Sequence, residues 1–395
     1  MRDGSPPSPL EAPLAGDSPA HHPQTIAAKP NAHPGQFHLG YRPALDGIRG
    51  ISILFVLFVH NGLIRDSFGF LGINTFFVLS GFLITSLLVA EWDQTGSIRF
   101  RNFYFRRALR LLPALITMLV VFLIYVFLFD PHKRAMRELY EALRALFYCT
   151  NIARVLRIGK SDMLANTWSL SLEEQFYFLW PPILFWLLRK TDRKSLLSWI
   201  ALGIFLSVLT RISLFLCGTD QIAGNVYPAS PERLLGCLDT RADSLLVGCF
   251  AGVLMSTNLR PGDKLAIPLT LLAGLASIGL LLCATHSFLE GRMICFGLTV
   301  ASIFAAILIV QQVTTARTPL HWILENPVLV YIGKISYGIY LWNYPLLHRP
   351  FIPTNLGYPW QNLVNLIPVV IAVLACYYLV ERPCLKLKRT FQIVC

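Results

Sequence analysis

The sequence is poor in charge for its length. Only 14% of its 395 residues are charged, while 54% are hydrophobic. A soluble domain usually carries about 25% charged residues. The composition therefore excludes an ordinary soluble protein and is typical of a chain that crosses a membrane several times.

The sequence also lacks the motifs of several common enzyme classes. It contains no HExxH metal motif, no Walker loop and no GxSxG nucleophile motif. Its nine cysteines are scattered and form no CxxC pair, so we interpret them as small apolar residues rather than as a disulfide framework. We expect no metal site and no nucleotide hydrolysis.

The first forty residues lack an apolar core, so we expect no cleavable signal peptide there. They are rich in Pro, Ser, Ala and His, which favours a disordered tail over 1–40. Runs of roughly 20 mostly apolar residues follow and predict membrane-spanning helices. The predicted spans are roughly 47–64, 68–90, 111–130, 169–188, 196–217, 242–256, 264–285, 293–311, 328–347 and 362–381.

These spans predict an all-α polytopic membrane protein with about ten transmembrane helices in one bundle, over 41–389, and a short C-terminal tail at 390–395. The net charge of +12 raises the question of nucleic-acid binding. However, basic residues concentrate in segments that cytoplasmic termini would place inside, such as 99–110 and 382–389, as the positive-inside rule requires. We therefore expect both termini in the cytoplasm, a multi-pass protein of the plasma (inner) membrane, and no nucleic-acid partner.

Two connections predict coverings of the bundle. The segment "RAMRELYEALRALFY" (134–148) has apolar residues at helical spacing, which indicates an amphipathic helix on the outer face or folded back over the bundle. A second cover is expected at 219–241. The small residues of "GFLGINTFFVLSGFLITSLL" (69–88) predict close helix packing.

Three ionisable residues, Asp46, Arg49 and His60, lie in the first apolar stretch, "ALDGIRGISILFVLFVHNG". Arg49 and His60 are eleven positions apart, which places them on one helix face, separated by about 16 Å along the axis. We expect Arg49 at the cytoplasmic surface and His60 near mid-membrane, where a neutral imidazole accepts a proton or attacks a carbonyl. The alternative is a structural histidine bonded to a neighbouring helix. Asp46 is interpreted as an N-cap.

A basic and aromatic stretch, "RFRNFYFRRALRLLPAL", precedes the third span. Arg107 and Arg110 are one helical turn apart and are able to converge on one polyanion. Guanidinium groups fit phosphate oxygens well. The alternative is that these arginines only anchor the helix by the positive-inside rule.

Two adjacent carboxylates, Glu173 and Glu174, lie in "TWSLSLEEQFYFLWPP" at the start of the fourth span. A carboxylate at this depth is costly unless paired, so we expect one of them to face the bundle interior. There it orients the imidazole or takes part in proton transfer with an incoming hydroxyl. The alternative is a buried ion pair with an arginine such as Arg211.

The order of these motifs resembles that of the membrane-bound acyltransferase family 3, the O-acetylases of cell-surface glycans. The resemblance covers roughly 41–389. It rests on "YRPALDGIRGISILFVLFVH", "GFLGINTFFVLSGFLIT", "FYFRRALRLLPA", "WSLSLEEQFYFLWP", "ISYGIYLWNYPLL" and "YYLVERP".

The resemblance implies an enzyme, an O-acyltransferase that moves an acyl group, most often acetyl, from cytoplasmic acyl-CoA to a hydroxyl at the outer face. The acceptor would be a glycan, a lipid-linked saccharide or a related metabolite in contact with membrane lipid. Carried over residue by residue, the family motifs assign the donor site to Arg49, Arg107 and Arg110. They assign the chemistry to His60 and Glu173.

The sequence departs from the family at two positions. Members commonly have Asp where this chain has Asn74, and His where it has Asn343, and an amide cannot exchange a proton as those groups do. A family subset carries a fused extracytoplasmic hydrolase-like domain, which we expect here to be a separate protein. Two other functions stay open: a transporter or flippase of a lipid-linked or acylated metabolite, and a catalytically silent membrane scaffold.

Overall fold

The computed structural model describes residues 39–129, 135–158, 163–217, 219–222, 225–228, 230–257, 265–287, 290–315, 318–348 and 360–390. The two predicted tails, 1–40 and 390–395, lie outside the described residues except for 39–40 and Thr390.

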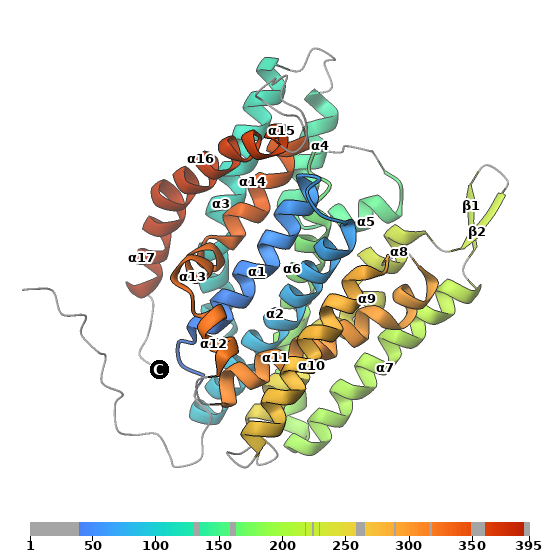
Figure 1. Ribbon diagram of the computed structural model, residues 1–395, viewed down its shortest axis with the longest axis vertical. Coiled ribbons are helices and arrows are strands. Elements are labelled where there is room, and N and C mark those ends of the chain that lie inside the picture. Colours follow the sequence, from blue (N-terminus) through green and yellow to red (C-terminus); the bar gives the residue numbers. More distant parts are fainter. Residues whose placement is uncertain are drawn as a thin grey trace, which may run out of the picture. The chain divides into compact units, whose positions relative to one another are not determined.

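The described chain is almost entirely helical, as predicted (Figure 1). The first elements are α1 (Pro43–His60), α2 (Asp66–Thr95), α3 (Phe100–Phe129), α4 (Ala135–Leu146), α5 (Thr150–Val155), α6 (Thr167–Lys190), α7 (Arg193–Cys217), β1 (Thr219–Ile222) and β2 (Asn225–Pro228). They are followed by α8 (Pro231–Gly236), α9 (Leu238–Met255), α10 (Ala266–Thr285), the π-helical turn η2 (Met293–Gly297), α11 (Leu298–Thr314), α12 (Pro319–Leu324), α13 (Pro327–Lys334), α14 (Ser336–His348), α15 (Trp360–Val364), α16 (Leu366–Cys376), the π-helical turn η3 (Tyr377–Glu381) and α17 (Arg382–Thr390).

Helix α1 is shifted relative to its predicted bounds. It begins with Pro43, whose fixed φ suits the first helical position, and its N-cap is Arg42. Asp46 lies inside the first turn, so its prediction as the N-cap was wrong. The helix ends at His60 because Gly62 takes a left-handed conformation (φ 69°) that turns the chain toward α2. His60 is therefore the last residue of α1 and does not lie within a span reaching residue 64.

Seven helices are long and apolar enough to cross a bilayer within the described residues, which identifies an integral membrane protein. They are Pro43–His60, Asp66–Thr95, Phe100–Phe129, Arg193–Cys217, Ala266–Thr285, Met293–Thr314 and Trp360–Lys386. Of the other predicted spans, α6 and α9 each carry several charged residues. The segment 328–347 is divided at Ile335 into α13 and α14. The total of about ten spans and the cytoplasmic termini stay predictions.

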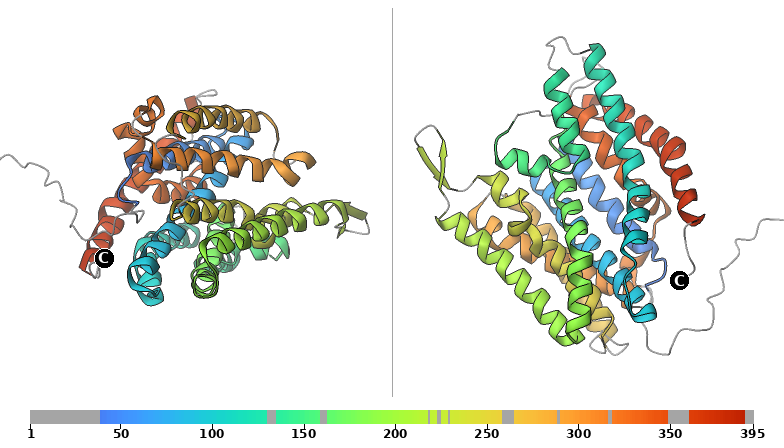
Figure 2. Two further views of the ribbon diagram at one scale, coloured as in Figure 1. Left: turned by 90° about the horizontal axis from the view of Figure 1, so that it is seen from below. Right: turned by 180° about the vertical axis from the view of Figure 1, so that it is seen from behind.

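Helices α1 and α2 run through the middle of the bundle (Figures 1 and 2). Helix α7 and the β1–β2 hairpin lie on one side of them, and α16 and α17 lie on the other. Helix α2 packs against α9, and α1 packs against α13 and α14. The outer helices therefore pack around α1 and α2, which form the centre of the bundle.

Glycines allow α2 and α9 to approach closely, as the small residues of 69–88 predict. A Cβ at Gly81 would lie 2.0 Å from the main-chain oxygen of Leu245, and a Cβ at Gly248 would lie 2.0 Å from that of Val78. No side chain fits at either position without moving a helix backbone. This packing fixes α9 against the helix that lines the candidate site.

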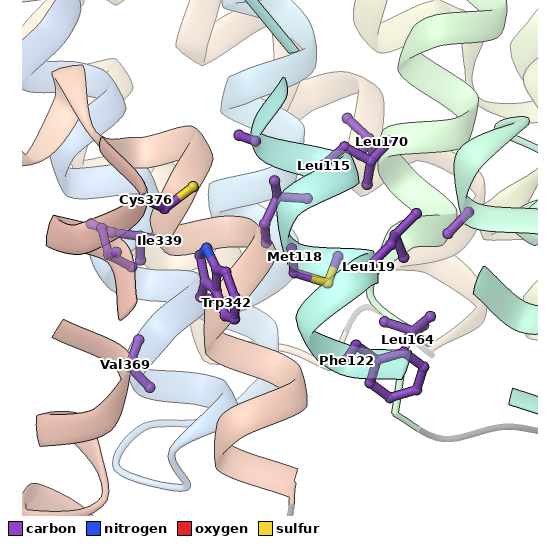
Figure 3. Close-up of a cluster of buried hydrophobic side chains, with 14 of the residues drawn as sticks. Leu115, Met118, Leu119, Phe122, Leu164, Leu170, Ile339, Trp342, Val369 and Cys376 are labelled. Carbon is purple, nitrogen blue, oxygen red and sulfur yellow. The ribbon is translucent and has the colours of Figure 1, made fainter. Parts of the chain in front are cut away.

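The apolar core beside α1 is built from α3, α14 and α16. Leu115, Met118 and Phe122 of α3 are buried in one cluster with Ile339 and Trp342 of α14, and Phe122 lies beside Leu164 (Figure 3). Side chains from α16 close the cluster from the far side. The cluster ties the helix that carries the arginines to the helix that carries Asn343.

The predicted amphipathic helix at 134–148 is present as α4, which packs against α3. Glu138 and Glu141 lie on its buried side, whereas Met136 and Leu143 are exposed. The predicted apolar face is therefore divided: Met136 and Leu143 are exposed, whereas Leu146 packs against the core. Arg144 makes this burial tolerable, because it pairs with the Glu141 carboxylate at 2.6 Å.

The second predicted cover, 219–241, is divided between several elements. Strands β1 and β2 pair antiparallel, with Thr219 opposite Pro228 and Ile222 opposite Asn225. The short helix α8 follows, and α9 already begins at Leu238.

Candidate functional site

A cavity of about 880 Å³ lies among α1, α2, α3, α6 and α14. Its lining follows α2 from Ile73 to Gln94, which corresponds to about 30 Å at 1.5 Å per helical residue. The volume lies within the range of small-molecule sites, roughly 300–1,000 Å³. The cavity thus suits a long, narrow ligand.

Three arginines, Arg49, Arg106 and Arg110, bring to this cavity a positive charge that has no ion pair among the described residues. Arg49 of α1 and Arg110 of α3 both line it, and Arg49 is the charge that acts most strongly on Arg110. Within the described part of the chain, neither guanidinium has a hydrogen bond or an ion pair. The structure therefore brings these two predicted donor-site residues together.

Arg107 also lines the cavity, but its guanidinium is already held. It donates from Nε to both carboxylate oxygens of Glu174, at 3.0 Å each, and a further bond joins Nη2 to the same carboxylate. It also lies over the ring of Tyr177. The ion pair with an arginine that the alternative predicted is therefore present for Glu174, but its partner is Arg107. Arg211, the example given, pairs instead with Asp243 at 3.0 Å, and both are fully buried.

Glu173 faces the cavity from α6. Its Oε1 accepts hydrogen bonds from the hydroxyl groups of Ser80 and Tyr177. Among the described residues no contact joins it to His60. One prediction was that this carboxylate orients the imidazole directly. The described residues show no such contact.

Hydroxyl groups gather at the part of the cavity wall formed by α6 and α14. The Ser169 hydroxyl lies 2.5 Å from that of Tyr340, which in turn donates to the main-chain oxygen of Asn166. Ser336 also lines the cavity; it is 1% exposed, and its Oγ has no hydrogen-bond partner among the described residues. This hydroxyl is a buried polar group of the cavity wall without a partner in the described ranges.

His60 lies outside the lining of the cavity. Its Nδ1 is 2.5 Å from Oδ1 of Asn343, and its ring meets the Tyr344 ring edge-on at a centroid distance of 4.8 Å. Asn343 follows Tyr340 by one turn of α14 and donates to its main-chain oxygen at 3.0 Å. The imidazole is therefore linked to the cavity wall through α14, while Arg49 enters the cavity directly.

The family model described as an acyltransferase domain matches residues 42–382. The chain belongs to this acyltransferase family. It is 32% identical over 364 residues to the peptidoglycan O-acetyltransferase OatA of Listeria monocytogenes, an alignment that covers 88% of this chain and 56% of OatA. It is also 32% identical over 370 residues to the putative peptidoglycan O-acetyltransferase YrhL of Bacillus subtilis, covering 88% and 55% of the two chains.

A third relative, the putative O-acetyltransferase SAS0844 of Staphylococcus aureus, is 31% identical over 316 residues, covering 78% of this chain and 51% of the relative. The chain thus spans about half the length of the curated relatives it matches. No solved structure matches it.

Asn74, the first departure from the acyltransferase family pattern, lies away from the cavity lining. It is 0% exposed, and its Oδ1 accepts from Nη2 of Arg241 at 3.2 Å and from Oγ of Ser244 at 2.7 Å. Arg241 is fully buried, and its Nε and Nη1 have no hydrogen-bond partner in the described ranges. Asn74 therefore serves the packing of a buried cation between α2 and α9.

Sequence reasoning missed Glu381 of the acyltransferase domain. Its motif "YYLVERP" contributed to the resemblance, but no role was assigned to it. The π-helical turn η3 ends at Glu381, which is 6% exposed and on which the charge of Arg110 acts. Its Oε1 has no hydrogen-bond partner in the described part of the chain. The only signal in the sequence was a carboxylate at the end of an apolar span.

Proposed function

We propose that the protein transfers an acyl group, acetyl by preference, from acyl-CoA to a hydroxyl group of a saccharide. The observation that carries this proposal is the long cavity that holds three arginines, Arg49, Arg106 and Arg110, without carboxylate partners among the described residues. A phosphorylated donor with a thin, extended arm fits this combination of length and charge.

In this proposal Arg49 and Arg110 bind phosphate groups of the donor, because guanidinium groups form charge-assisted hydrogen bonds with phosphate oxygens. Arg107 has a different role, although the family motif assigns it to the donor site. Its charge is balanced by Glu174, so it shapes the wall and fixes α3 against α6. The end of the cavity lined by Glu91 and Gln94 of α2 would then face the cytoplasm, in agreement with the positive-inside rule.

The acyl end of the donor would lie near Ser336 and the hydroxyl pair of Ser169 and Tyr340. Glu173, held by two hydroxyl donors, provides a carboxylate within the same cavity for proton transfer. His60 would act from the other side of the α14 wall, on the acceptor hydroxyl or on the acyl carbon. The two routes share the same donor site.

The acceptor class is supported by the relatives, two of which are named for O-acetylation of peptidoglycan. We propose a cell-envelope glycan or a lipid-linked precursor of it as the acceptor of this chain. It would approach the end of the bundle at which α1 ends and α2 begins, where His60 lies.

The test measures transfer of radiolabelled acetyl from acetyl-CoA to soluble peptidoglycan fragments by the purified protein in lipid nanodiscs. We expect transfer by the native protein, loss of transfer in His60→Ala, and normal transfer in His286→Ala. His286 is a matched control because it is an exposed histidine far along the chain in the turn after α10. Equal rates in the two variants would remove His60 from the mechanism.

A further inference from the structure

The side-chain amide of Asn343 has only one orientation that satisfies its surroundings. Its Nδ2 donates to the main-chain oxygens of Ile339 at 2.7 Å and Tyr340 at 3.0 Å. An amide nitrogen carries two hydrogens, so both are used. The reversed orientation would place the amide oxygen against two carbonyl oxygens and lose both bonds. The network therefore fixes Oδ1 toward α1.

The partner of this oxygen is Nδ1 of His60, at 2.5 Å. An amide oxygen is only an acceptor, so Nδ1 must carry a hydrogen. A neutral imidazole has one N–H and one lone pair, and the lone pair is therefore on Nε2. The edge-on ring of Tyr344 limits rotation of the imidazole about this bond.

We propose that Asn343 is a positioning residue that selects the Nδ1–H tautomer of His60 and so makes Nε2 the reacting nitrogen. The second half of this statement rests on the proposed function, whereas the tautomer does not. The proposal also gives a role to Asn343, which stands at a position where the family commonly has His. An amide oxygen suffices, because the bond needs an acceptor and no proton exchange.

Both chemical routes use this tautomer. As a base, Nε2 takes the proton of the acceptor hydroxyl while the hydroxyl oxygen bonds to the acyl carbon. The C–S bond of the thioester then breaks, and the proton passes to the departing thiolate. As a nucleophile, Nε2 bonds to the acyl carbon as the C–S bond breaks, and the acceptor oxygen displaces it later, its proton going to the thiolate. In both cases Nδ1 keeps its hydrogen on Asn343.

The direct test is nitrogen-15 NMR of histidine-labelled protein in nanodiscs at alkaline pH, where free imidazole is neutral. The His60 signals are assigned by their loss in His60→Gln. We expect a protonated Nδ1 and an unprotonated Nε2. A protonated Nε2 overturns the proposal, and this reading is independent of any activity.

Two variants separate positioning from general packing. Asn343→Leu removes the acceptor, and we expect the Nδ1–H signal to be lost and kcat to fall by about a hundredfold, a typical contribution of a positioned base, with KM for acetyl-CoA unchanged. Asn362→Leu is the control, because Asn362 donates to the main-chain oxygen of Asn61 beside His60 at 2.6 Å and has no hydrogen bond to the imidazole among the described residues. It should leave the tautomer and kcat unchanged.

An unchanged tautomer in Asn343→Leu, or an equal loss of kcat in both variants, contradicts the proposal. Should the native protein show the Nδ1–H tautomer while His60→Ala retains full transfer, the proposed function of His60 fails and the positioning by Asn343 stands. If Asn343→Leu does not fold, the spectrum of the native protein still decides the tautomer.

Discussion

Replacing Arg49 or Arg110 with glutamine should weaken donor binding strongly. Each change removes a guanidinium that lines the cavity and has no carboxylate partner among the described residues. A hydrogen bond to a charged group contributes about 1.5–3 kcal/mol, which corresponds to a loss of affinity of roughly tenfold to a hundredfold. Equilibrium binding of radiolabelled acetyl-CoA to the purified protein measures this loss.

Dephospho-CoA sharpens the experiment, because it lacks one phosphate group of the donor. If Arg110 binds that phosphate, its replacement and the dephosphorylated ligand should cause losses that do not add, whereas independent contacts would add. Arg189→Gln is the matched control, since Arg189 is a cation near the end of α6, beside Phe185, that does not line the cavity. Unchanged affinity in Arg49→Gln and Arg110→Gln, or an equal loss in Arg189→Gln, would refute the donor site.

Three further predictions concern the scaffold of the site and are measured by thermal unfolding in detergent. Glu174→Gln should destabilise the protein by about 3 kcal/mol, because it leaves the partly buried Arg107 without its counter-charge; an unchanged melting temperature would contradict this. Gly81→Ala should separate α2 from α9 and prevent stable folding, whereas Gly274→Ala, where an added Cβ meets nothing within 4 Å, should be neutral or slightly stabilising. Asn74→Leu should lower the free energy of unfolding by about 3 kcal/mol, because it removes a hydrogen-bond acceptor from the buried Arg241. Asn74→Asp keeps an acceptor oxygen and should be more stable than Asn74→Leu; equal stability of these two variants would show that the acceptor is unimportant.

The sequence predicts the class of the fold and the members of the site better than their pairings. Hydropathy alone identified a helical membrane protein, and seven predicted spans coincide with helices of sufficient length. The end of α1 was missed because apolar character continues past His60, while a glycine at 62 with positive φ ends the helix. Hydropathy is insensitive to such a turn.

Pairings across the bundle were the main failure. Arg107 and Glu174 are separated by 67 residues and His60 and Asn343 by 283. Motif spacing within one helix says nothing about which of several arginines meets a glutamate on another. The assignment of Arg49, Arg107 and Arg110 to the donor came from the family resemblance. All three line the cavity, and their role in donor binding stays a prediction.

The central claim is that the acyl group passes from acyl-CoA on one side of the membrane to a saccharide on the other. Measuring transfer across a sealed membrane tests this claim most directly. The protein is reconstituted in one orientation in sealed vesicles that enclose peptidoglycan fragments, and labelled acetyl-CoA is added outside, on the side of Arg49 and Arg110. The account predicts free CoA outside and acetylated saccharide inside in equal amounts, with both lost in His60→Ala. Saccharide that crosses the membrane without consumption of acetyl-CoA, or undiminished acetylation in His60→Ala, would contradict it.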